Sequence, residues 1–401
     1  MANPASNRFG VNAEQPTVDF AVSQARKQKV VDQLWKGLQG LMKSRKITTV
    51  EGTGTLGPGK VVSVDGGTQL QGRHVILASG SVPRTIPGFE IDGRFVLTSD
   101  EVLSLDSLPA RAVVIGGGAI GCEFASMMSD LGTEVTVLEA LPKLLPGCDA
   151  DVVAVVARSF KSRGIDVRTG ATVDGHTPNG DATVVHVGGD DITTDAVVVS
   201  VGRRPLSENL GLEGTGVVVD ERGFVQVDER MRTEEDGVYA VGDLVNTPQL
   251  AHVGFAEAMV AVRDILGEDP LPVDYSRVPW GIYCHPEVAF AGMSEQAAKD
   301  AGLDVVTAKH RFAGNGRALI IGEAEGLVKV IAEKGADGKA GRILGVHMVG
   351  PWVTEQLAAG YLAVNWEAVP EEVAHFIQPH PTLTETFGET VMSLTGRGLH
   401  G

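Results

Sequence analysis

The sequence predicts an α/β protein with more than one domain, and three observations support this. The chain has 401 residues, which is enough for two or three domains with sizeable cores. Within Val113–Ala140 an apolar strand, a glycine-rich turn, a helix and a second strand follow one another. From about Tyr275 the sequence changes to strands with helices between them, which is typical of an α+β domain.

The predicted elements of the N-terminal half begin with a helix. From Val18 to about Met42 apolar residues recur at helical spacing, and basic residues gather in the second half of this segment. The segments KITTVEGTGTL and GKVVSVDGGTQL predict an antiparallel meander, and GRHVILASGSVP predicts a returning strand that ends in a turn. Pro109 marks a boundary, and the apolar run from Ala112 predicts a buried parallel strand. Further strands are predicted at DAVVVSVG and GVYAVGDLV, and a helix is predicted at AHVGFAEAMVAVRDIL. Strands of the last domain are predicted at LVKVIAEK and RILGVHMVG.

The composition excludes several classes of function. Lys and Arg number 34 against 51 Asp and Glu, so the formal charge of −17 would repel nucleic acid. A basic protein partner is easier to accept, although a solvated acidic surface is the simpler explanation. We expect a cytoplasmic protein, because no targeting segment and no apolar run of about 18 residues occurs. Cys122, Cys148 and Cys284 are too few and too widely spaced to predict disulfides or a metal site, and each is expected to be a small buried residue.

Gly116, Gly118 and Gly121 form a GxGxxG pattern between a strand and a helix. In a dinucleotide site the three glycines serve a tight turn, close approach to the pyrophosphate, and close packing of helix on strand. Glu139 ends the next strand, at about the spacing of an acid that accepts hydrogen bonds from the ribose. Its charge would repel a 2′-phosphate and the next two residues offer no arginine, so NAD is favoured over NADP. An ordinary glycine-rich turn is the alternative, which the order of strand, helix and acid disfavours.

Two more polar positions are ambiguous from the residues alone. Asp243 follows an apolar strand in GVYAVGDLV, where an aspartate is most often a turn residue. IQPHPTLTETFGE carries His380 and Glu385, and an imidazole oriented by a carboxylate can take a proton near neutral pH. Thr382 and Glu385 also have the spacing of a helix capping box. The spacing leaves both readings open.

A resemblance to a known family adds to this. The chain contains, in order, EGTGTL, VILASGSVPRTIPG, GGGAIGCEFA, VGRRP, GVYAVGDLVNTPQLAH, YCHPEVAFAGMSE, NGRAL and HPTLTE. From about Gly10 to Gly388 it resembles the flavin-dependent pyridine nucleotide-disulfide oxidoreductases, and among them the dihydrolipoyl dehydrogenases. The resemblance implies two Rossmann-like domains, of which the FAD-binding one is incomplete, and a C-terminal α+β dimerisation domain. The implied boundaries are 1–105 for the first part of the FAD domain, 106–228 for the NAD domain, 229–274 for the second FAD part and 275–401 for dimerisation.

The resemblance also implies roles for single residues. His380 would be the catalytic base and Glu385 its orienting acid, both reaching into the partner subunit's site, and Asp243 would hold the flavin ribityl chain. Two positions depart from the family pattern: Ser79 replaces a threonine, and Gln378 stands where a second histidine is usual. The implied NAD contacts are Gly116, Gly118, Ala119, Ile120, Gly121, Glu123, Glu139, Val173 and Gly202. The implied FAD contacts are Gly54, Ser79, Gly80, Ser81, Asp243, Leu250, Ala251 and His252.

The implied activity is FAD-dependent oxidation of protein-bound dihydrolipoamide with reduction of NAD. The implied partners are a second copy of the chain and the lipoyl and basic subunit-binding domains of a 2-oxoacid dehydrogenase complex. The sequence contains neither the CxxxxC redox pair of this family nor its first GxGxxG, so we expect an N-terminally shortened form. Glu139 argues against the NADP-using reductases, and HPTLTE argues against mercuric reductase. The alternatives are a transhydrogenase-like flavoprotein and an NAD-binding homodimeric scaffold without redox activity.

Overall fold

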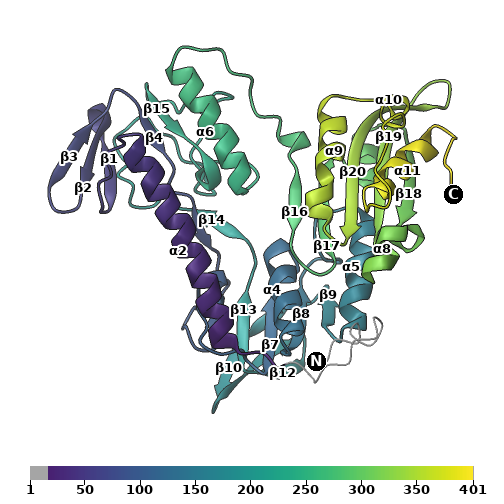
Figure 1. Ribbon diagram of the computed structural model, residues 1–401. Helices are drawn as coiled ribbons and strands as arrows, with labels where there is room; N and C mark the ends of the chain where they lie inside the picture. Colours follow the sequence, from purple (N-terminus) through teal and green to yellow (C-terminus); the bar gives the residue numbers. More distant parts are fainter. Residues whose placement is uncertain (1–16, 401) are drawn as a thin grey trace. The chain divides into compact units, whose positions relative to one another are not determined.

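The computed structural model describes residues 17–400, which form two compact units (Figure 1). Among the described residues, the larger unit contains 17–20, 85–201 and 276–400. The smaller unit contains residues 21–84 and 202–275. Each unit is therefore built from stretches that are separated in the chain. The mixed α/β class predicted from the sequence is confirmed, while the four domain boundaries stay a prediction.

A parallel sheet forms the first half of the larger unit. Its strand order is β6-β13-β7-β8-β9, and each neighbouring pair is parallel. All four residues of β13 are buried, as expected of a central parallel strand. The strands are β6 (Val96–Leu97), β7 (Arg111–Ile115), β8 (Glu134–Glu139), β9 (Asp166–Thr169) and β13 (Ala196–Val199), and the helices are α3 (Ser99–Val102), α4 (Ala119–Asp130) and α5 (Ala150–Ser162).

A small antiparallel sheet is inserted between β9 and β13. Its buried residues Val185 and Val187 pack with Phe89 and Phe95 into the same core as Val113. The insertion therefore extends the parallel sheet's core and has none of its own. Its strands are β10 (Val173–Asn179), β11 (Ala182–Val187) and β12 (Asp190–Thr194).

The second half of the larger unit is a five-stranded antiparallel sheet with the order β16-β17-β20-β19-β18. Helices α9 and α11 pack on it and bury Leu357 and Val391 against Val346 and Met348. The strands are β16 (Trp280–Ile282), β17 (Glu287–Gly292), β18 (Val305–Arg311), β19 (Leu327–Lys334) and β20 (Ala340–Gly350). The helices are α7 (Glu295–Asp300), α8 (Gly316–Ile321), α9 (Val353–Asn365), α10 (Pro370–Val373) and α11 (Glu385–Leu394).

The smaller unit combines a meander with two strand pairs. Strands β4 and β15 are parallel, β5 and β14 are antiparallel, and Leu56, Val238, Ala240 and Leu244 share a core. The strands are β1 (Gly54–Gly57), β2 (Val61–Val64), β3 (Thr68–Gln71), β4 (Val75–Leu77), β5 (Ser81–Pro83), β14 (Arg203–Pro205) and β15 (Val238–Ala240), and the long helices are α2 (Phe20–Ser44) and α6 (Ala251–Ile265).

Helix α2 matches the segment predicted from the apolar spacing, but it buries none of its 25 residues. Leu34 is 69% exposed and Trp35 is 58% exposed. An apolar stripe that stays in contact with water contributes little stability, because helices in proteins are held mainly by packing. Nowhere in residues 17–400 does a helix have the length and apolarity that crossing a membrane would require.

Candidate cofactor and proton-transfer sites

The glycine turn between β7 and α4 contains two kinds of glycine, those that the protein's own backbone requires and one that has open space beside it. Gly116 has φ of 108°, and a Cβ there would lie 2.4 Å from the Ser200 carbonyl oxygen. A Cβ at Gly121 would lie 1.9 Å from the carbonyl oxygen of Gly116. The protein's own backbone therefore requires these two glycines.

Gly118 is different, because an added Cβ would meet nothing within 4 Å. It is the N-cap of α4, and no side chain caps the helix there. The backbone amides at Ala119 and Ile120 thus begin a helix whose N-cap glycine has open space beside it. A helix N-terminus of this kind favours an anion such as a pyrophosphate, so the turn fits a dinucleotide.

Glu139 lies beside this turn at the end of β8. It is 7% exposed; its Oε2 accepts a hydrogen bond from the Gly117 amide at 2.6 Å and its Oε1 accepts one from the Leu141 amide at 2.7 Å. Each carboxylate oxygen keeps a second lone pair, so the side chain can still accept from a ribose hydroxyl. The structure therefore brings the acid and the glycine turn together.

Glu123 lies one turn into α4 and accepts a hydrogen bond from the Tyr283 amide at 2.8 Å. Burial raises the pKa of its carboxyl above the ordinary value, and the Tyr283 hydrogen bond opposes this without cancelling it. Val173 lies at the start of β10, half-buried against the core. Gly202, the remaining predicted NAD contact, belongs to the smaller unit.

His380 and Glu385 form a hydrogen-bonded pair in the larger unit. The Nδ1 atom of His380 lies 2.8 Å from Oε1 of Glu385, and the histidine side chain is 79% exposed. Burial raises the pKa of Glu385, but the hydrogen bonds from the Thr382 amide and from His380 outweigh it. The pKa of Glu385 is therefore below its ordinary value and the carboxylate stays charged.

The capping-box interpretation is confirmed for Glu385 but not for Thr382. Oε2 of Glu385 accepts from the Thr382 amide at 2.8 Å, as in a capping box, while Oε1 serves His380. However, α11 begins at Glu385 with Thr384 as N-cap, and the Thr382 hydroxyl donates to the Pro379 carbonyl instead of capping the helix. One glutamate therefore serves both the helix start and the histidine.

Sequence reasoning missed the residue that anchors this loop. Asn315 is 8% exposed, and its Nδ2 donates to the Thr382 carbonyl at 2.9 Å and to the Thr386 hydroxyl at 3.1 Å. Its Oδ1 accepts from the Ala318 amide and so caps α8. The NGRAL segment signals an N-cap asparagine, but nothing in the sequence shows that its amide group reaches the segment after His380.

In the smaller unit the structure brings the Ser79-Gly80-Ser81 turn and Asp243 together. The Ser81 hydroxyl donates to Oδ2 of Asp243 at 2.6 Å, and Arg203 donates to the Ser81 hydroxyl at 2.7 Å. The Ser79 hydroxyl donates to the Leu206 carbonyl, so serine keeps a hydroxyl contact at this position. Gly80 has φ of 72°, which suits glycine.

Asp243 also lies beside the start of α6, which has Leu250 as N-cap, Ala251 and His252 in its first turn, and no side-chain cap. Glu257, a residue that the sequence analysis missed, is fully buried in this helix. Its Oε2 accepts from the Gly242 amide at 2.6 Å and its Oε1 accepts from the Tyr275 hydroxyl at 3.0 Å. A charged residue within the apolar helix pattern was the available signal. Gly54 opens β1 in the separate meander.

All three cysteines are buried in one apolar cluster of the larger unit. Burial raises the pKa of Cys122, and it raises the pKa of Cys148 and of Cys284 to about 12. Thiols in this state are poor nucleophiles, because the thiolate is the reactive form. The expectation that they are small buried residues is met.

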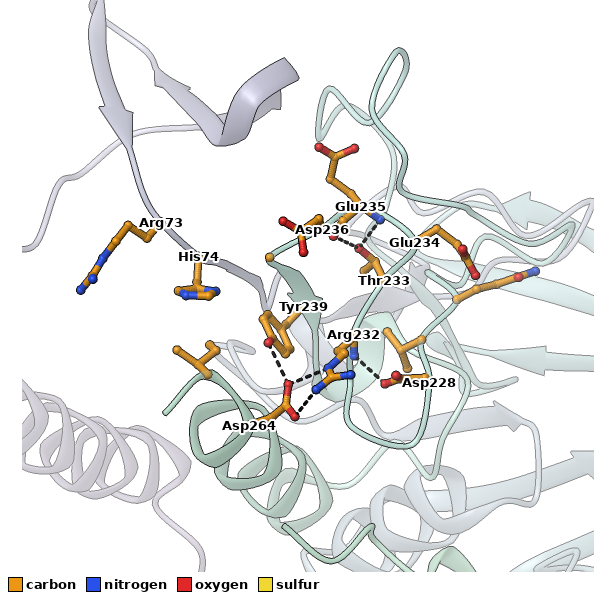
Figure 2. Close-up of a pocket in the computed structure, with 14 residues that line it drawn as sticks. Arg73, His74, Asp228, Arg232, Thr233, Glu234, Glu235, Asp236, Tyr239 and Asp264 are labelled. Atoms are coloured by element: carbon orange, nitrogen blue, oxygen red, sulfur yellow. Dashed lines mark hydrogen bonds and ion pairs between the residues drawn. The ribbon is translucent and has the colours of Figure 1, made fainter. Parts of the chain in front are cut away.

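The smaller unit also contains a polar pocket of about 670 Å³ (Figure 2). Arg73 and His74 precede β4 and Gly237 precedes β15, so the pocket lies at the starts of these parallel strands. Asp243 follows the end of β15, and ligands of open α/β sheets bind at such carboxyl ends. The pocket is therefore separate from the predicted FAD contacts. Asp264 within it joins Arg232 and Tyr239.

Comparison with known proteins decides the family. Residues 4–258 match the pyridine nucleotide-disulphide oxidoreductase family, and residues 278–391 match its dimerisation domain. The chain belongs to this family. FAD and NAD(P) are therefore its cofactors by family membership, and the dimerisation domain supports a homodimer.

Relatives extend this family assignment over nearly the whole chain. The chain is 40% identical to dihydrolipoyl dehydrogenase of Bacillus subtilis, over 98% of this chain and 86% of that protein. It is 35% identical to the mitochondrial dihydrolipoyl dehydrogenase of Pisum sativum, over 100% of this chain and 81% of that one. The HOCl-induced flavoprotein disulfide reductase RclA of Escherichia coli has a TM-score of 0.87 at 26% identity, covering 93% of this chain and 86% of its own. These relatives lend no support to a non-redox scaffold.

Proposed function

We propose that this protein oxidises dihydrolipoamide on a lipoyl domain and reduces NAD to NADH, with bound FAD. The observation that carries the proposal is the His380–Glu385 pair, in which a carboxylate orients an exposed imidazole. A glycine turn beside a buried acid, in the same unit, supplies a place for NAD. Relatives that are 35–40% identical over nearly the whole chain bear the name dihydrolipoyl dehydrogenase.

The residues fit the two cofactors as follows. The amides of Gly118, Ala119 and Ile120 would receive the NAD pyrophosphate, because the turn is open there. Glu139 would accept from the adenosine ribose, and its charge selects NAD over NADP. When bound, the flavin and the nicotinamide carry the electron pair. The other proposed NAD contacts are Gly116, Gly121, Glu123, Val173 and Gly202. The proposed FAD contacts are Gly54, Ser79, Gly80, Ser81, Asp243, Leu250, Ala251 and His252.

His380 would take the proton from a thiol of the substrate. Glu385 accepts from Nδ1–H, so Nε2 is the ring nitrogen that keeps a lone pair for the incoming proton. In the overall reaction the two thiols lose two protons and two electrons and form one S–S bond. NAD⁺ takes up both electrons and one proton, and the second proton is released. The exposure of His380 suits a base that serves a site shared with the partner subunit.

No cysteine of this sequence is assigned a part in the thiol chemistry. The sequence contains no CxxxxC pair, and its three thiols are buried with raised pKa values.

The net charge of −17 favours a basic subunit-binding domain as the docking partner in a 2-oxoacid dehydrogenase complex. Three unpaired cysteines fit a reducing compartment, and we place the protein in the cytoplasm.

The test is the rate of NADH formation from NAD⁺ and dihydrolipoamide, measured with flavin content on the same sample. His380→Gln should lower kcat by about 10²- to 10⁴-fold, the usual contribution of a general base, while the dissociation constant for NADH stays unchanged. His375→Gln, at an exposed histidine five residues earlier, is the matched control and should retain the rate. Equal rates in all three proteins would refute the role of His380, and a flavin-containing protein that makes no NADH would refute the function.

A further inference from the structure

Lys329, on β19 in the larger unit, is a buried lysine surrounded by carboxylates. It is 3% exposed, and its Nζ lies 3.0 Å from both oxygens of Asp149, 2.8 Å from Oδ2 of Asp151 and 2.7 Å from Oε2 of Glu295. We call these four residues the ion cluster. Burial alone would lower the pKa of Lys329. The hydrogen bonds to the three carboxylates outweigh burial, so the pKa lies above its ordinary value. A buried charge of this kind is costly unless it is paired, and the three carboxylates supply that pairing.

Asp149 is the member of the ion cluster that connects to the nucleotide site. It is 2% exposed and is the N-cap of α5, where its Oδ1 accepts from the Asp151 amide at 3.0 Å. Its Oδ2 accepts from the Glu295 amide at 3.2 Å. Asp149 thus ends the loop of residues 140–148, which begins directly after Glu139.

This loop packs on the glycine turn. The Leu145 amide donates to the Gly117 carbonyl at 2.8 Å. A Cβ at Gly117 would lie 2.5 Å from a methyl carbon of Leu144, so this side chain is already in contact with the turn. Leu144 and Leu145 are each 1% exposed, and the Cys148 amide donates to the Leu145 carbonyl. A continuous series of packed residues therefore connects Asp149 with Gly117.

The other end of the loop is fixed too, because the Leu141 amide donates to Glu139 at 2.7 Å. The glycine turn is thus held by a loop whose start is bound by Glu139 through Leu141, and whose end is joined to Asp149, which Lys329 binds. We propose that Lys329 is a positioning residue for the dinucleotide. Through Asp149 and the loop, a strand of the antiparallel sheet holds the glycine turn in the shape that receives the pyrophosphate. This inference rests on the proposed NAD site.

The test compares Lys329→Met with Lys309→Met by titration calorimetry of the flavin-containing protein with NADH. Lys309 faces Lys329 across the β18–β19 pairing, but its side chain is 53% exposed and bonds Asp151 from outside. Lys329→Met should weaken NADH binding by about fivefold or more, the size of effect seen along coupled networks. Lys309→Met should change it by less than about twofold, because exposed ion pairs contribute little.

A double variant separates positioning from simple loss of packing. In Lys329→Met the buried Asp149 carboxylate loses the cation that pairs with it. Adding Asp149→Asn removes this unpaired negative charge and keeps a side-chain oxygen that can cap α5. The double variant should therefore bind NADH more tightly than Lys329→Met alone. If Lys329→Met does not fold, the single variant Asp149→Asn tests the inference. Lys329 keeps the carboxylates of Asp151 and Glu295 in this variant, and the affinity for NADH should still fall.

Unchanged affinity in Lys329→Met, an equal loss in Lys309→Met, or a double variant that binds NADH no more tightly than Lys329→Met would each overturn the inference. Where Lys329→Met does not fold, unchanged affinity in Asp149→Asn would overturn it. Failure of the unaltered protein to bind NADH would instead refute the proposed function.

Discussion

At the scale of single residues, the candidate sites of this chain are built around carboxylates that each accept hydrogen bonds from two partners. Glu139 accepts from two backbone amides beside the glycine turn, and Glu385 accepts from the Thr382 amide and from His380. The motifs predicted that Glu139 accompanies the glycine turn and that Glu385 accompanies His380, because the residue types and their spacing are local, and the structure brings both pairs together. The sequence could not show that Asn315 and Glu257 support the candidate sites, since each acts on a residue distant in the chain or on an amide of another element.

The role proposed for Glu139 can be tested by exchanging its charge. Glu139→Arg should change the ratio of NADH to NADPH dissociation constants by about tenfold or more in favour of NADPH, because repulsion of the 2′-phosphate becomes attraction. Glu134→Arg, at the exposed start of the same strand, is the control and should leave the ratio unchanged. Equal ratios in both variants, measured by calorimetry, would refute the assignment.

At the scale of elements, the segments of the larger unit whose apolar runs predict a strand do form strands, because such runs are local to the chain. The buried run of β13 and the apolar strands β19 and β20 are examples. Helix α2 shows the limit of this reasoning. Its apolar spacing predicted the helix, but burial depends on what other elements cover it, and none of its residues is buried.

Helix α6 is held near its end by the hydrogen bonds of Asp264, and these lead to a further prediction. Asp264 is buried, accepts hydrogen bonds from Arg232, Arg230 and Tyr239, and has its pKa lowered to about 2, first by Arg232. Asp264→Asn should lower the free energy of unfolding by about 2 kcal/mol, because hydrogen bonds to charged groups are lost. Asp269→Asn, at an exposed partner of Arg230, should cost far less.

The pH dependence of this effect has a defined sign. A carboxyl whose pKa is lowered on folding stabilises the protein fully above the unfolded value of 3.8, and the stabilisation is lost as the pH falls toward about 2. The difference in unfolding free energy between the unaltered protein and Asp264→Asn should therefore shrink between about pH 4 and pH 2. A difference that stays constant over this window in denaturant titrations would contradict the role of Asp264.

At the scale of the whole molecule, the order of the motifs predicted the family, because together they are far more specific than any one of them. Both compact units are assembled from separated stretches, which local patterns cannot reveal. Lys329 illustrates this: the apolar pattern of LVKVIAEK predicts a strand, but nothing local to that strand shows that the fold buries its lysine among three carboxylates.

The account depends most on the claim that the glycine turn receives NAD, and Gly118→Ala tests it most directly. Gly118 has φ of −74° and an added Cβ would meet nothing within 4 Å, so this variant should fold with unchanged stability. Gly116→Ala should instead destabilise the protein, because φ is 108° and the Ser200 carbonyl is too close. Calorimetry with NADH should show about tenfold or greater loss of affinity in the stably folded Gly118→Ala variant, since its methyl group occupies space the pyrophosphate needs. An affinity equal to that of the unaltered protein would contradict the account.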